Sequence, residues 1–138
     1  MRNVILADAG HWACVIDTTG NTIDHAYTLA VGEGCQLDAG SGNLEGIDPL
    51  LKPLARNRSD RPVRALTLGS PAIDSGDPDM AGAGGACFPN DEDGTPRPLD
   101  GDDDGIARCD MGAIEYDDQI FADDFDTLPV ARGTATIP

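Results

Sequence analysis

The stretch LGSPAIDSGDPDMAGAGGACFPNDEDGTPRPLDGDDDGIARCDMGAIEY, residues 68–116, decides how the rest of the chain is interpreted. It holds two of the four cysteines and the most regular run of turn residues. Of the 25 acidic residues in the chain, 21 are Asp, which bonds its own backbone in turns, whereas Glu favours helices. With 17 Gly and 10 Pro, the composition argues against helix. We therefore predict a β-rich or loop-rich protein in which this stretch forms a cap.

Length and charge set the class of protein. A chain of 138 residues favours one domain with a modest core. The formal charge of −16 repels phosphate backbones and anionic lipid surfaces, so it argues against nucleic acid and membrane-surface binding and favours cations as partners. No stretch approaches the roughly 20 apolar residues of a membrane helix, so we expect no membrane insertion.

The charge is unevenly distributed along the chain. Residues 91–126 contain fourteen acidic residues against Arg97 and Arg108, a net of −12. Residues 52–64 carry five basic residues against Asp60, a net of +4. This basic segment is either a recognition patch or solvated charge that pairs locally with the acidic segment.

The first part of the chain has the spacing of short strands separated by turns. The predicted strands are too short for a sandwich, and stacked coils of a solenoid suit their spacing better. They cover residues 3–7, 14–17, 22–24 and 27–31. Because the chain opens directly in an apolar strand pattern, we expect it to be the end of a longer protein, with upstream coils as its partner.

The predicted organisation has three parts. Residues 1–48 form terminal coils, residues 49–116 form a cap with an acidic loop, and residues 117–138 form a C-terminal tail. Pro49 and Pro53 fix two bends at the start of the cap. We expect Ile73 and Ile114 to pack together over the last coil and close the core, and Ile106, inside the acidic loop, to matter less.

The four cysteines indicate disulfides. Cys14 and Cys35 are 21 positions apart, and Cys87 and Cys109 are 22 apart, each about one turn of such a solenoid. Four cysteines allow three pairings, and the sequence does not choose among them; we predict the two local bridges. A zinc site needs close C-x-x-C pairs, which are absent. The bridges imply an oxidising compartment.

Four blocks in order carry a resemblance to a family. They are NLEGIDPLL at 43–51, GSPAIDSG at 69–76, GTPRP at 94–98 and CDMGAIE at 109–115. Together they resemble the closing segment of bacterial choice-of-anchor Q proteins, over about residues 1–116. The resemblance implies a right-handed parallel β-helix of the pectin-lyase-like type, secreted or at the cell surface, and generally without an assigned reaction. The expected fold class is therefore all-β, with terminal β-helix coils and a loop-rich, disulfide-closed cap.

An open solenoid supplies a physical reason for a cap. Its end presents unpaired backbone groups and exposed apolar rungs, which template aggregation unless they are covered. A proline-rich, disulfide-closed segment covers such an end.

The acidic loop contains the opening of a calcium-binding pattern. Asp100, Asp102 and Asp104 alternate before Gly105, as in D-x-D-x-D-G, where alternate carboxylates converge on the ion. The twelfth position is Met111 instead of a bidentate Glu, which argues against an EF-hand. The alternatives are a solvated acidic turn and a looser calcium site, completed by Asp110, Asp91 or Asp93.

The function expected from these features is a non-catalytic structural or adhesive, adhesin-like module of an extracellular β-helix protein. Neither histidine lies beside a nucleophile motif, so we expect no enzyme. One alternative is a fragment of a polysaccharide-active β-helix enzyme, since paired carboxylates cleave glycosides. Another is a subunit that stacks end to end into an extracellular fibre. Surface polysaccharide and identical subunits are thus the further candidate partners.

Overall fold

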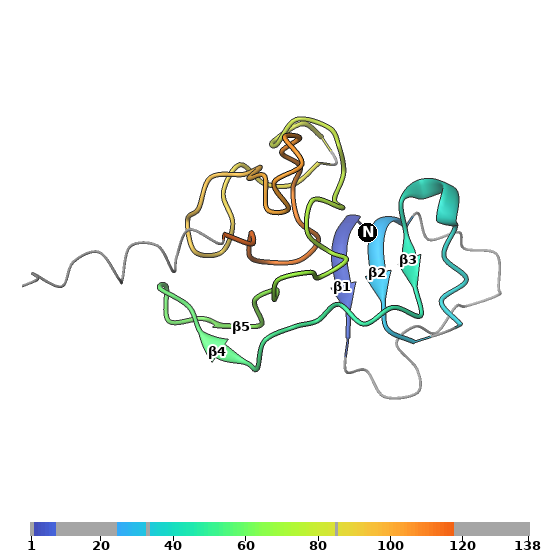
Figure 1. Cartoon of the computed structure of the whole chain (residues 1–138), viewed down its shortest axis with the longest axis horizontal. Coiled ribbons are helices and arrows are strands. Elements are labelled where there is room, and N and C mark those ends of the chain that lie inside the picture. The colour runs from blue at the N-terminus through green and yellow to red at the C-terminus, as the bar shows by residue number, and fades with distance from the viewer. Residues whose placement is uncertain (1, 8–24, 33, 85, 118–138) are drawn as a thin grey trace, which may run out of the picture.

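The computed structural model describes residues 2–7, 25–32, 34–84 and 86–117 (Figure 1). In these residues there are five short strands, one turn of 3₁₀-helix and no α-helix. No helix in this part of the chain is long and apolar enough to cross a membrane. The prediction of a largely non-helical chain is confirmed. The strands do not trace a complete solenoid, so the β-helix stays a prediction.

Three strands form a parallel sheet in the order β1-β2-β3 (Figure 1). They are β1 (Arg2–Leu6), β2 (Ala26–Ala30) and β3 (Leu44–Glu45). Val4 is opposite Thr28, and Leu29 is opposite Leu44. The strands predicted at 3–7 and 27–31 thus correspond to β1 and β2, shifted by one residue. Those predicted at 14–17 and 22–24 lie outside the described residues.

The buried side chain of Asn43 forms hydrogen bonds with the turns around this sheet. Asn43 accepts the Thr28 backbone amide at 2.9 Å through Oδ1. Its Nδ2 donates to the carbonyls of His25 at 3.1 Å and Asp38 at 2.8 Å. Asp38 in turn caps η1 (Ala39–Ser41), the 3₁₀ turn before β3. One side chain therefore satisfies backbone groups of β2, of the residue before it and of the crossover between β2 and β3.

The Glu45 carboxylate organises the same crossover. Glu45, in β3, accepts four consecutive backbone amides: Gly34, Cys35 and Gln36 bond Oε1, and Leu37 bonds Oε2. Desolvation acts to raise the pKa of Glu45, but these four hydrogen bonds outweigh it and lower the pKa below its ordinary value. The charged form of Glu45 therefore holds the turn that leads away from β2.

The core joins the sheet to the cap. Its buried centre contains Leu29 of β2 and four cap residues: Leu66, Ala72, Ile73 and Met111. The partly buried residues around it are Ile5, Tyr27, Leu44, Leu51 and Tyr116. The prediction that Ile73 closes the core is confirmed. Ile114 is also buried but lies outside this cluster, and Ile106 is 55% exposed.

The cap is attached to the edge of β1 that faces away from β2 (Figure 1). The Gly112 amide donates to the Asn3 carbonyl at 3.0 Å. Asn3 Oδ1 accepts the Asp77 amide at 2.7 Å, and Arg2 pairs with Asp77 at 2.7 Å. The predicted partner, the upstream coils of a longer chain, stays a prediction.

The start of the cap forms an antiparallel ribbon. β4 (Ala55–Arg56) pairs with β5 (Pro62–Val63), and an isolated bridge joins Leu51 to Leu66. The ribbon extends away from the parallel sheet (Figure 1). Of the predicted tail at 117–138, only Asp117 belongs to the described residues.

Candidate metal site

Three aspartates come together in the cap and can hold a metal ion. They are Asp74, Asp100 and Asp102, each offering one carboxylate oxygen, and these oxygens lie within 4.8 Å of one another. Asp74 is buried, whereas Asp100 and Asp102 are exposed. The sequence identified Asp100 and Asp102 as candidates but missed Asp74. Asp74 stands in the GSPAIDSG block, where no spacing pattern connects it to the acidic loop.

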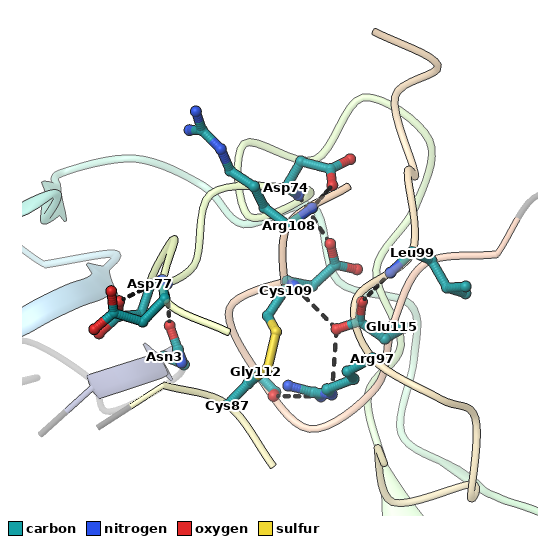
Figure 2. The surroundings of a disulfide bond; sticks show 12 residues. Asn3, Asp74, Asp77, Cys87, Arg97, Leu99, Arg108, Cys109, Gly112 and Glu115 are labelled. Carbon is teal, nitrogen blue, oxygen red and sulfur yellow. Dashed lines mark hydrogen bonds and ion pairs between the residues drawn. A yellow bond between two sulfur atoms is a disulfide. The ribbon is translucent and has the colours of Figure 1, made fainter. Parts of the chain in front are cut away.

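Asp74 also shapes the loop that brings the other two carboxylates to it. Its Oδ2 accepts the amides of Gly101 at 2.8 Å and Asp102 at 3.0 Å. Its Oδ1 accepts the Arg108 amide at 2.9 Å (Figure 2). A Cβ on Gly101 would lie 2.8 Å from Cγ2 of Ile73, so the loop can approach this closely only at a glycine. The acidic loop is thus wrapped around one buried carboxylate.

The other predicted ligands lie outside this group of three. Asp104 accepts the Ile106 amide at 2.7 Å, which makes it a local turn former. Asp93 accepts the Arg58 amide at 3.0 Å, from the ribbon. Asp110 accepts the Asp74 amide, and Asp91 accepts the Glu115 amide, within the cap. The predicted site of Asp100, Asp102 and Asp104, completed by Asp110, Asp91 or Asp93, stays a prediction.

Asp110 and Asp91 belong to a chain of carboxylates that we call the carboxylate relay: Asp74, Asp110, Glu115 and Asp91. Each member donates its backbone amide to the side chain of the next. Asp74 donates to Asp110 at 2.8 Å, Asp110 to Glu115 at 2.9 Å, and Glu115 to Asp91 at 3.0 Å. The relay connects three segments of the cap. Sequence reasoning missed Glu115, since its position one residue before Tyr116 carries no turn signal.

One arginine offsets part of this buried charge. Arg97 Nε lies 3.2 Å from Glu115 Oε1, with both side chains at most 5% exposed, although Nε lacks hydrogen-bond geometry. Its Nη2 donates to the Gly112 carbonyl at 3.0 Å, which ties the relay to the segment that docks on β1 (Figure 2). Arg97 therefore links the buried charge to the docking contact.

Burial changes the protonation of the relay. Desolvation, followed by the neighbouring Glu115 carboxylate, raises the pKa of Asp110 to about 7. Desolvation likewise raises the pKa of Glu115 above its ordinary value, against two backbone hydrogen bonds and Arg97. Asp110 is therefore partly protonated near neutrality, which reduces its repulsion with the Glu115 carboxylate.

A disulfide closes the cap beside the relay (Figure 2). Cys87 is bonded to Cys109, as predicted, with a sequence separation of 22. Cys35 is also disulfide-bonded, but Cys14 lies outside the described residues, so the Cys14–Cys35 pairing stays a prediction. The oxidised pair fixes the segment that carries Asp110 against the glycine-rich segment around Cys87.

The chemistry of the three-aspartate group is that of a hard-cation site. Carboxylate oxygens are the ligands that Ca²⁺ and Mg²⁺ prefer, with water completing the coordination shell. The group draws its ligands from two segments. A bound ion would therefore link the acidic loop to Asp74, which follows the core residue Ile73. Comparisons of the chain with protein-family models, curated proteins and solved structures found no match.

Proposed function

We propose that this chain is a terminal structural or adhesive module of a secreted or cell-surface β-helix protein, without catalytic activity. The observation that carries the proposal is the parallel stack of β1, β2 and β3, with a cap attached to the edge of β1. Parallel strands that neighbour one another in chain order, each joined by a crossover, are what successive coils produce.

The contacts around the stack support a capping role. The exposed edge of a sheet is a template for pairing with other chains. Gly112, Asn3 and the Arg2–Asp77 pair place the cap over that edge of β1. Ile73 and Met111 then bury apolar surface against Leu29. The cap thus protects both the backbone edge and the apolar interior.

An extracellular location is supported by the disulfide. Disulfides persist in oxidising compartments and are rare in reducing ones. The Cys87–Cys109 bridge closes a loop-rich segment with few backbone ladders of its own. A covalent bridge stabilises such a segment by restricting the unfolded chain.

Calcium is the ion that we propose for the three-aspartate group. Its flexible coordination of six to eight oxygens suits Asp74, Asp100 and Asp102 with added waters, whereas Mg²⁺ demands near-ideal octahedral geometry. The formal charge of −16 also favours binding of a divalent cation.

The capping role is tested by undocking the cap. Replacing Arg2 and Asp77 by Ala removes an ion pair whose aspartate side chain is only 3% exposed. The matched control replaces Arg56 and Asp60, an ion pair with side chains 68% and 82% exposed. We expect the first variant, and not the second, to melt at lower temperature and to scatter light as it aggregates. A capping role is refuted if both variants behave alike.

The proposed lack of catalytic activity is tested by a separate assay. The protein is incubated with a panel of neutral and acidic polysaccharides, and released reducing sugar and unsaturated product are measured. We expect no release. Release that disappears in Asp74→Asn would instead establish a polysaccharide-active enzyme.

A further inference from the structure

The antiparallel ribbon is a basic surface on a strongly acidic protein. We call residues 52–64 the basic ribbon; they carry a net charge of +4 in a chain of −16. Leu54 is 62% exposed between two of its cations, Lys52 and Arg56. The ribbon extends away from the parallel sheet (Figure 1). It therefore presents cations and one apolar side chain together.

Two ion pairs of the ribbon lie at the solvent-exposed surface. Arg56 pairs with Asp60, and Arg61 pairs with Glu92, with all four side chains at least 44% exposed. Exposed pairs of this kind contribute little and exchange readily with other partners. The backbone amide of Arg58 donates to the Asp93 side chain. This hydrogen bond does not use the guanidinium group of Arg58.

A surface of opposite charge lies elsewhere on the same molecule. Residues 100–106, the acidic loop, carry four aspartates and no base. Ile106 is 55% exposed at the end of this loop. The charge of the loop is thus opposite in sign to that of the ribbon, and the loop also has one exposed aliphatic residue beside its charges.

We infer that the basic ribbon of one molecule docks on the acidic loop of a second copy. The interface buries Leu54 near Ile106 while the ribbon's cations face Asp103 and Asp104. Because two different surfaces of the same chain meet, the contact is heterologous and makes either a closed ring or an open filament. This inference is independent of the proposed capping function.

A second copy fits better than a free polyanion. The net charge of −16 repels a long anionic polymer over its whole length. Two protein surfaces of limited size interact within a Debye length of about 8 Å at physiological salt, so local complementarity decides their contact. The exposed leucine and isoleucine add an apolar contribution that a polyanion lacks.

The experiment measures self-association of the full chain by sedimentation across protein concentration, with EDTA present. We expect association at about 50 mM salt that weakens as salt is raised toward about 1 M. Arg58→Glu should weaken it at least tenfold. Arg108→Glu changes the net charge equally but makes the surroundings of the acidic loop more negative, so it should not weaken association.

A second variant reverses the charge of one residue in the acidic loop. Asp104→Lys leaves Asp74, Asp100 and Asp102 in place and should also weaken association at least tenfold. An equimolar mixture of Arg58→Glu and Asp104→Lys retains one native ribbon and one native loop, so association should be restored between the two variants.

Three outcomes overturn the inference. The first is a monomer at every concentration and salt. The second is equal weakening by Arg58→Glu and Arg108→Glu. The third is retention of the chain on an anionic polysaccharide, lost in Arg58→Glu, without self-association. Circular dichroism of each variant, matched to wild type, shows that folding is preserved.

Discussion

The backbone amide of Asp74 donates to Oδ1 of Asp110 at 2.8 Å, across 36 positions of sequence. The Asp74 carboxylate meanwhile accepts the amides of Gly101, Asp102 and Arg108. Asp74 therefore holds the acidic loop with its side chain and the carboxylate relay with its backbone. The candidate metal site and the buried framework of the cap share this one residue.

Calcium should stabilise the protein through the three-aspartate group. A ligand that binds only the folded state adds about 2.7 kcal/mol at 100 times its dissociation constant. We expect Asp100→Asn to abolish most of the calcium-induced rise in melting temperature. Asp103→Asn removes one charge from the same loop but lies outside the group, so it should retain the rise. Equal responses of the two variants would mean that calcium acts only on the overall charge.

The stability of the cap should depend on pH through Asp110. Its folded-state pKa of about 7 lies above the ordinary value of 3.8, so the folded chain binds an extra proton between those values. This contribution is complete below about pH 4 and is lost as the pH rises through 7, at up to about 1.4 kcal/mol per pH unit. Urea unfolding in EDTA should show stability falling over this range.

Two variants separate the groups responsible for the pH dependence. Asp110→Asn should flatten the fall between pH 4 and 7, with a remainder from Glu115, whose pKa is also raised. Glu45 has a lowered pKa, so its contribution is present above its ordinary value of 4.5 and is lost only as the pH falls below it. Glu45→Gln should therefore lower the stability at neutral pH and remove the pH dependence only below about pH 4.5. An unchanged slope in Asp110→Asn would contradict the assignment.

Core truncation should distinguish the isoleucines of the cap. Ile73 is 7% exposed within the core cluster, so Ile73→Ala should cost about 2–5 kcal/mol. Ile114 is 9% exposed, and we expect a smaller loss because it lies outside that cluster. Ile106→Ala, at a 55% exposed position, should stay within about 0.5 kcal/mol. Denaturant midpoints measure all three, and an Ile73 effect below about 1 kcal/mol would refute the core assignment.

The disulfides should be recovered by peptide mapping without reduction. We expect one peptide pair joined by Cys87–Cys109 and another by Cys14–Cys35. Replacing both Cys87 and Cys109 by Ala should cost about 3 kcal/mol, because the bridge restricts a 22-position loop in the unfolded chain. Free thiols, or a peptide joining Cys35 to Cys87, would contradict the pairing of the second bridge.

The sequence by itself determined the features that depend on local chemistry. Glycine, proline and aspartate excluded long helices because they favour turns over short distances. Asp102 and Asp104 each accept an amide two residues onward, as the alternating pattern predicts. The separation of Cys87 and Cys109 similarly indicated a local bridge. These properties require only neighbours in the chain or one closed loop.

The tertiary structure alone decided which residues became buried partners. Asp74 joined Asp100 and Asp102, and Asp110 and Glu115 acquired raised pKa values, because packing removed water from them. The position of the cap on β1 likewise depends on contacts such as Arg2–Asp77, 75 positions apart. An aspartate in a turn and an aspartate in a buried relay have the same local pattern. Desolvation and distant hydrogen-bond donors distinguish them, and both arise only when the chain has folded.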